Sequence, residues 1–210
     1  MAGAFCPIPG QGLQMAPEAV PLPKSGIALE DELGVAILAG GCFWCTEAVI
    51  AALDGVHSVM PGYAGGDAAS ANYDAVCSGR TAHAEAIRIS YDPARIGFGA
   101  ILRIFFTVAH DPTQRNRQGH DVGPQYRSAI FPVDAAQRAL AEAYIRELDA
   151  FGVFAAPIVT TIEPDHAFFP AEAVHHGYAD RNPAQRYVQA VALPKLDKLD
   201  HHFPERLRRD

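Results

Sequence analysis

The chain has 210 residues, of which 49% are hydrophobic and 20% charged, as in folded globular proteins and unlike disordered chains. Its net charge of -7 at pH 7 comes from mixed charges without a long basic stretch, which argues against nucleic acid as a partner. No apolar run approaches the roughly 20 residues that cross a bilayer, and residues 1–10 lack the basic start and apolar stretch of a signal peptide, so we expect a cytoplasmic protein without a membrane anchor.

Residues 1–30 are rich in proline and glycine, and this composition predicts an irregular N-terminal arm. A single domain is expected over residues 31–200, because a chain of this length can bury one core of generous size. Residues 201–210 are predicted to be a charged tail.

Hydrophobic patterning predicts an alternation of strands and helices. Short apolar or alternating runs predict strands at residues 34–39, 56–63, 83–91, 126–131 and 158–162. Apolar residues at helical spacing predict helices at residues 43–53, 98–108 and 134–151. We expect a loop or an edge segment at residues 67–80, a loop at residues 113–124, and a segment from Pro183 onward that wraps the surface or frays. This order indicates the α/β fold class, an α+β sandwich in which helices pack on a mixed sheet.

Two of the four cysteines, Cys42 and Cys45, lie where the first predicted strand passes into the first predicted helix. The start of a helix supplies unpaired N–H groups and a partial positive charge, which favour the nucleophilic thiolate. Two cysteines three residues apart can also close a disulfide within the first helical turn, as redox pairs of this spacing do. The pattern indicates redox chemistry in which one cysteine attacks and the other resolves.

Other interpretations of the cysteine pair remain open at this point. Both residues could be small buried hydrophobic side chains, which is common for free cysteine. The pair could also belong to a thiol-disulfide oxidoreductase acting on protein disulfides, or to a zinc module in which Cys77 and His83 complete the ligand set. The second half of that zinc site lacks a paired motif, so we expect no metal and no other cofactor.

Glu85 is the second unusual residue. Alternation within residues 83–91 places its carboxylate on the same strand face as Ile87, Ile89 and Tyr91. Burial raises the pKa of a carboxyl group, which can then donate a proton near pH 7. A glutamate at the rim of the sheet that reaches water is an equally good interpretation of this residue alone.

Several segments together resemble the A-type peptide methionine sulfoxide reductases, from about Val35 to Lys198. Gly40-Gly41-Cys42-Phe43-Trp44 is similar to the nucleophile segment of that family. The other segments are Gly62-Tyr63-Ala64-Gly65-Gly66 with Asn72-Tyr73, Val76-Cys77-Ser78-Gly79 with His83-Ala84-Glu85-Ala86, and the block from Asp111-Pro112-Thr113 through Asn116-Arg117-Gln118-Gly119 and Asp121 to Gln125-Tyr126-Arg127-Ser128. Agreement at so many spaced positions is specific.

The resemblance implies a ferredoxin-like core with long loops, in which residues 31–200 form the catalytic domain. It implies repair of oxidised proteins by reduction of methionine S-sulfoxide, free or in peptides. Cys42 would be the nucleophile and Glu85 the proton donor to the sulfoxide oxygen, which the hydroxyls of Tyr73 and Tyr126 would hold. The cysteine would become a sulfenic acid, a reversible oxidation state.

The resemblance also implies how the substrate is bound. Phe43 and Trp44 would form the pocket for the methionine methyl group, and Asp121 would bind the substrate region through hydrogen bonds or water. Cys77 belongs to the family pattern without a catalytic role, so we expect a buried thiol there.

The chain departs from many members of that family in its recycling cysteines. Those proteins have glycine at the position of Cys45 and place recycling cysteines near the C-terminus, after a tyrosine like Tyr187; here Val188 follows, and no cysteine lies beyond Cys77. The chain is similar to a subgroup with a paired Cys-Phe-Trp-Cys segment. This implies a Cys42–Cys45 disulfide that thioredoxin reduces, and we expect the protein to act as a monomer.

Overall fold

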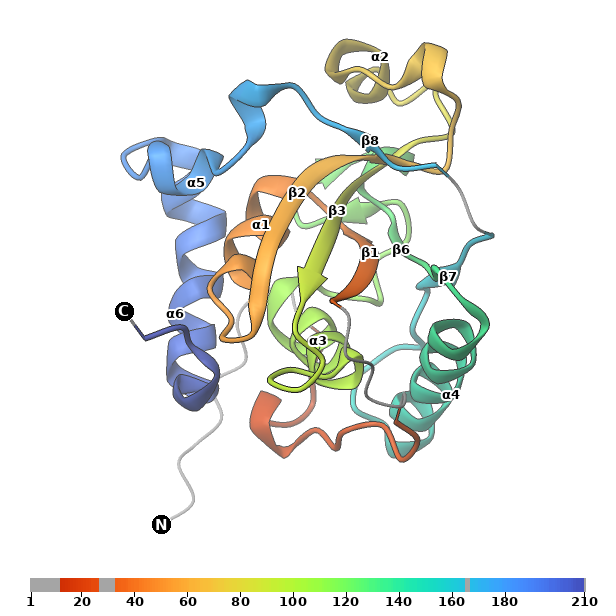
Figure 1. The fold of residues 1–210 in the computed structure, drawn as a ribbon, viewed down its shortest axis with the longest axis vertical. Coiled ribbons are helices and arrows are strands. Elements are labelled where there is room, and N and C mark those ends of the chain that lie inside the picture. The colour runs from red at the N-terminus through yellow and green to blue at the C-terminus, as the bar shows by residue number, and fades with distance from the viewer. Residues whose placement is uncertain (1–11, 27–32, 165–166, 210) are drawn as a thin grey trace.

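The computed structural model of this chain describes residues 12–26, 33–164 and 167–209. Its centre is a six-stranded sheet in the order β7-β6-β1-β3-β2-β8 (Figure 1). The strands are β1 (Gly34–Gly40), β2 (Val56–Ala64), β3 (Ala84–Tyr91), β6 (Ser128–Phe131), β7 (Thr161–Ile162) and β8 (Phe169–Pro170). β6 and β7 run parallel and the other neighbours antiparallel, so the sheet is mixed as predicted. A separate short hairpin pairs β4 (Arg117–Gln118) with β5 (Asp121–Val122).

The helices pack around this sheet. They are α1 (Phe43–Ala51), α2 (Tyr73–Cys77), α3 (Phe98–Ile104), α4 (Ala135–Phe151), α5 (Tyr178–Arg181) and α6 (Leu193–His202). The chain order β1-α1-β2-β3-α3-β6, with strand order β6-β1-β3-β2, is the ferredoxin-like arrangement that the resemblance implied. None of the helices in the described ranges is long and apolar enough to cross a bilayer.

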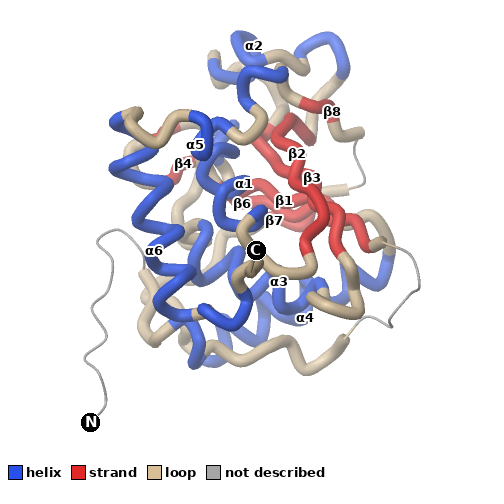
Figure 2. The backbone as a smooth tube through the Cα atoms, turned by 60° about the vertical axis from the view of Figure 1, so that its left-hand side comes forward, coloured by secondary structure: helices blue, strands red, loops and turns tan. Residues whose placement is uncertain are grey.

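Helix α1, which begins after Cys42 and contains Cys45, is almost completely buried. Seven of its nine residues are buried, because it contacts β2 and β3 on one side and α5 and α6 on the other (Figure 2). A helix covered on two sides is apolar all round, which explains why Val49 and Ile50 are adjacent and both fully buried. The enclosed position of α1 fixes the cysteines at its N-terminal end.

Several local predictions were wrong. The loop expected at residues 113–124 contains the hairpin of β4 and β5. Residues 67–80 were expected to be a loop or an edge segment but contain α2, which Asn72 caps by accepting a hydrogen bond from the Ala75 backbone. Tyr126 lies in a 3-10 turn (Pro124–Tyr126) ahead of β6, and residues 158–160 precede β7. The segment from Pro183 onward was expected to wrap the surface or fray. Instead it forms a π-helical turn (Val188–Ala192) and α6, which pack on α1.

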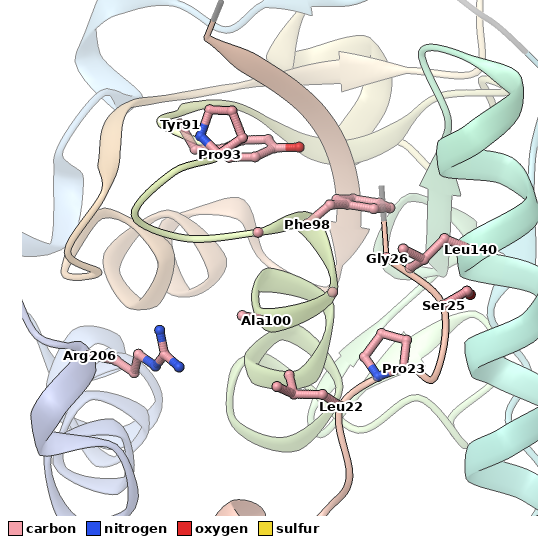
Figure 3. A pocket seen from close by; sticks show the side chains of 12 residues that line it. Leu22, Pro23, Ser25, Gly26, Tyr91, Pro93, Phe98, Ala100, Leu140 and Arg206 are labelled. Atoms are coloured by element: carbon pink, nitrogen blue, oxygen red, sulfur yellow. The ribbon is translucent and has the colours of Figure 1, made fainter. Parts of the chain in front are cut away.

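A cavity of about 310 Å³ lies between the N-terminal arm, the start of α3 and the C-terminal segment (Figure 3). It is lined by Leu22, Pro23, Ser25, Gly26, Tyr91, Pro93, Gly97, Phe98, Gly99, Ala100, Leu140 and Arg206. None of the predicted site residues is among them. This cavity is therefore separate from the cysteine pair.

Candidate active site

Cys42 lies at a sharp turn between the end of β1 and the start of α1. Gly41 makes this turn with a φ of 85°, a conformation that favours glycine, and a Cβ there would lie 2.7 Å from Cβ of Gln118. Cys42 is the N-cap of the helix, and its carbonyl accepts hydrogen bonds from the backbone N–H groups of Cys45 at 3.1 Å and Thr46 at 3.3 Å. The backbone therefore fixes Cys42 at the helix start, where the sequence predicted it.

Glu85 lies deep in the sheet beside this turn, not at its rim. Glu85 is 3% exposed, and it is the cross-strand partner of Tyr63 where β3 pairs with β2. The backbone N–H of Phe43 donates a hydrogen bond to Oε2 of Glu85 at 2.9 Å. Burial raises the pKa of Glu85 to about 8, although the hydrogen bond from Phe43 lowers it in part. The carboxyl group is therefore mostly protonated at pH 7.

The two cysteine thiols influence each other, and their pKa values shift in opposite directions. Burial raises the pKa of the Cys42 thiol, because its thiolate would lose solvent and lie near Cys45 and Glu85. The hydrogen bond from Cys42 lowers the pKa of Cys45 to about 7, and the cation of Lys195 adds to this effect. The helix start was expected to favour the Cys42 thiolate, but in the free protein the negative charge of the pair is better placed on Cys45.

Asp121 reaches the cysteine pair through Tyr187. The Tyr187 hydroxyl donates a hydrogen bond to Oδ2 of Asp121 at 2.5 Å and lies 3.8 Å from Sγ of Cys45, whose thiol donates to it. Cys45 is 1% exposed. Asp121 on β5 and Cys45 on α1 are therefore connected by a single hydroxyl group.

Aromatic rings form a wall beside Cys42. Phe43 is buried, and its ring lies 5.3 Å from His175 and 5.9 Å from Tyr63. The ring of Trp44 stacks on Tyr178 at 3.8 Å with an interplanar angle of 10°. Nε1–H of Trp44 donates to Nδ1 of His175 at 3.3 Å. The two aromatic residues after Cys42 are thus held in place by the segment that contains α5.

The predicted oxygen-holding tyrosines come from helix α2 and from the 3-10 turn Pro124–Tyr126. Tyr73 opens α2, and its hydroxyl lies near the thiol of Cys77. Burial raises the pKa of both Tyr73 and Tyr126 well above the usual range, and the nearby Glu85 adds to both shifts. Both phenols therefore remain protonated and can donate hydrogen bonds. Cys77 was expected to be buried but is partly exposed.

Glu172 joins several parts of the wall and was missed in the sequence. It accepts hydrogen bonds from the Tyr63 hydroxyl at 2.8 Å and from the Tyr73 backbone at 2.9 Å. His175, Tyr178 and Tyr187 were also missed as site residues. The segment 172–187 has no periodic pattern that marks it as part of the site, and the place of Tyr187 next to the usual recycling cysteine was the one signal that could have identified it.

The zinc interpretation finds no ligand set. Within the described residues, no group of three or more His, Cys, Asp or Glu side chains is arranged to hold a metal ion. Nε2 of His83 instead lies 2.9 Å from the Asp67 carbonyl. Cys42, Cys45 and Cys77 are all free thiols.

Comparison with known proteins identifies the family. The family model described as peptide methionine sulfoxide reductase matches residues 34–207. The chain is 51% identical over 173 residues to peptide methionine sulfoxide reductase MsrA of Chromobacterium violaceum, which covers 82% of this chain and 98% of that protein. It is 49% identical over 173 residues to the MsrA of Deinococcus radiodurans, covering 82% and 84%. The crystal structure of reduced Mxr1 from Saccharomyces cerevisiae is similar with a TM-score of 0.67 at 34% identity, covering 77% of this chain and 92% of that one.

The matched region, residues 34–207, includes every residue described in this site. Its paired thiols and buried acid are groups that a thiol-based reduction needs. The chain belongs to the peptide methionine sulfoxide reductase family and is a thiol-based oxidoreductase that reduces methionine sulfoxide to methionine.

Proposed function

We propose that Cys42 attacks the sulfur of the S epimer of methionine sulfoxide while Glu85 protonates the sulfoxide oxygen. One observation carries this assignment. The protonated carboxyl group of Glu85 is hydrogen-bonded at 2.9 Å to the backbone N–H of Phe43, the residue that follows Cys42. This contact holds a neutral acid beside the nucleophile, where oxygen gains negative charge during the attack.

The acidities of the thiols suggest how Cys42 loses its proton. Near pH 7 the pair can carry one negative charge, with Cys42 donating its hydrogen bond to the Cys45 thiolate. As Sγ of Cys42 bonds to the substrate sulfur, its proton passes to Cys45. Glu85 gives its proton to the oxygen, and the S–O bond breaks as oxygen moves to Cys42. The products are methionine, a sulfenic acid on Cys42, a neutral Cys45 and an ionised Glu85.

The residues around the pair supply the binding groups. Phe43 and Trp44 would receive the methionine methyl group, since their rings form an apolar wall supported by Tyr178. The protonated hydroxyls of Tyr73 and Tyr126 would hold the sulfoxide oxygen. We propose that Asp121 binds the same substrate region through hydrogen bonds or water.

Recycling would proceed through Cys45. Its thiol lies close enough to that of Cys42 to be affected by it, and it would attack the sulfenic acid to give a disulfide and water. We propose thioredoxin as the reductant, on the grounds of the Cys-x-x-Cys spacing. We also propose that the protein acts on free or protein-bound substrate as a monomer in the cytoplasm, and that its catalytic domain spans residues 31–200.

Two single substitutions test the roles of the cysteines. Cys42→Ser is expected to abolish methionine formation, because an alcohol is a far weaker nucleophile than a thiolate. Cys45→Ser is expected to release about one methionine per protein and then stop, because Cys42 is oxidised but not recycled. The measurement is methionine released with and without thioredoxin, thioredoxin reductase and NADPH. Sustained turnover by Cys42→Ser would overturn the assignment of the nucleophile.

A further inference from the structure

The Tyr187 hydroxyl lies between the buried Cys45 thiol and a carboxylate. Its oxygen is 3.8 Å from Sγ of Cys45 and 2.5 Å from Oδ2 of Asp121, to which it donates its hydrogen. These groups come from α1, from the residue preceding the π-helical turn 188–192, and from β5. A chain of two hydrogen bonds therefore leads from the Cys45 thiol, which donates to Tyr187, to Asp121.

Disulfide formation requires that Cys45 lose a proton. After Cys42 has been oxidised, Cys45 holds the proton that it received from Cys42, and it is 1% exposed. Bulk water therefore has poor access to this thiol. The groups that act on Cys45 are Cys42 from the same helix, Glu85 from β3, Asp121 from β5, Lys195 from α6 and the Tyr187 hydroxyl. Of these, Glu85 is ionised after the first step but is bonded to the Phe43 backbone, whereas Tyr187 contacts the sulfur of Cys45.

We propose that Tyr187 relays the proton of Cys45 to Asp121 during formation of the Cys42–Cys45 disulfide, an inference that rests on the proposed role of Cys45 as resolver. The S–H proton of Cys45 moves to the Tyr187 oxygen as the Tyr187 proton moves to Asp121, so Tyr187 begins and ends neutral. The Cys45 thiolate attacks Sγ of the Cys42 sulfenic acid, and the S–S bond forms as the S–O bond breaks. The departing hydroxide takes the proton from Asp121 and leaves as water. The sulfenic sulfur is reduced, the Cys45 sulfur is oxidised, and Asp121 returns to its carboxylate form.

The test separates the two chemical steps in a single turnover. Each protein is mixed with methionine sulfoxide in the absence of reductant and quenched at intervals. Methionine reports the first step and the Cys42–Cys45 disulfide, measured by mass spectrometry, reports the second. In Tyr187→Phe we expect the ratio of the second rate constant to the first to fall by about 100-fold or more, the usual size of a lost proton-transfer group. The sulfenic acid should accumulate and be trapped by dimedone.

Two further variants distinguish a relay from a merely structural role. Tyr144→Phe removes a tyrosine hydroxyl outside the site, where it donates to the Pro21 carbonyl, and we expect it to leave the ratio of the two rate constants at the wild-type value. Asp121→Asn is nearly isosteric but cannot take up a proton from Tyr187, so the ratio should fall as in Tyr187→Phe. Between pH 6.5 and 8.5, the disulfide step of both relay variants should accelerate more steeply than in the wild type, because hydroxide replaces the lost base.

Failure of the Tyr187 relay can be told apart from failure of Cys45 as the resolving cysteine. A wild-type ratio of rate constants in Tyr187→Phe and Asp121→Asn, with the wild-type pH slope, would overturn the relay and leave Cys45 as resolver. If the wild-type protein forms its disulfide between Cys42 and another cysteine, the assignment of the resolver is wrong and the relay falls with it.

Discussion

At the scale of single residues, burial sets the chemistry of the site more strongly than the helix start does. Cys42 lies at the N-cap of α1, yet the surroundings of its thiol raise its pKa. The same exclusion of water raises the pKa of Glu85 to about 8. An acid and a nucleophile that both keep their protons suit a reaction in which oxygen must be protonated as sulfur is attacked.

Glu85→Gln is expected to slow the first chemical step by about 10²–10⁴-fold, because the amide has no acidic proton to give to the oxygen. The amide oxygen can still accept the hydrogen bond from Phe43, so the turn should persist. Since the wild-type carboxyl group is protonated below its pKa of about 8, the part of the rate that depends on this acid should decline as pH rises through 8. This decline should be absent in the variant. Single-turnover methionine formation between pH 6 and 9 measures both effects, and a variant rate within tenfold of wild type would contradict the role of Glu85.

The sequence was informative for residues whose position depends on local structure. Cys42 and Cys45 follow from a strand that meets a helix, and Glu85 from the two-residue period of β3. Tyr187 and Glu172 could not be found in this way, because their partners are distant in sequence. Tyr187 contacts Cys45, and Glu172 contacts Tyr73. The raised pKa of Cys42 was missed for the same reason, since it depends on what surrounds the thiol.

At the scale of elements, α1 is held to the C-terminal half of the chain by a buried carboxyl group. Glu47 is 6% exposed and accepts a hydrogen bond at 2.9 Å from the backbone N–H of Gly177, which precedes α5. Gly177 has a φ of 57°, a conformation that favours glycine. This bond fixes the segment that carries His175 and Tyr178, and through them the ring of Trp44.

Glu47→Ala is expected to lower the free energy of unfolding by about 1–3 kcal/mol at pH 5, because it leaves the Gly177 N–H without its acceptor. Glu47→Gln keeps an acceptor and serves as the matched control. Burial raises the pKa of Glu47 to about 7, so the unfolded chain releases this proton at lower pH than the folded protein does. The stability of the wild type relative to Glu47→Gln should therefore fall between pH 5 and pH 8, by roughly 1–3 kcal/mol. Urea unfolding at both pH values measures these differences, and equal stability of all three proteins would contradict the contact.

The elements that the sequence predicted well are those with long or regular patterns, such as α4, which Asp134 caps and Gly152 ends. The errors lie where tertiary contacts decide. Helix α2 is five residues long and needs the Asn72 cap and the contact of Glu172 with Tyr73. The apolar residues near the C-terminus, such as Leu199, are few, but they are buried in the same core as α1.

At the scale of the whole molecule, both ends of the described chain pack on the central domain. Near the C-terminus, the backbone of Asp54 donates to the Arg206 carbonyl at 2.7 Å. Near the N-terminus, the Gln14 backbone donates to the Val153 carbonyl at 2.8 Å, and the Tyr144 hydroxyl donates to Pro21. The arm was predicted to be irregular from its proline and glycine content, but that composition says nothing of docking.

The arm contributes to stability through the few side chains that it buries. Leu13 is 3% exposed, lies in the main core and forms an antiparallel bridge with Phe154. Leu22, nine residues later in the same arm, is 45% exposed. Leu13→Ala is therefore expected to lower the free energy of unfolding by about 2–5 kcal/mol, since it removes buried methyl groups and leaves a cavity. Leu22→Ala should change it by less than about 0.5 kcal/mol. Equal effects of the two substitutions in urea unfolding would mean that the arm does not pack on the core in solution.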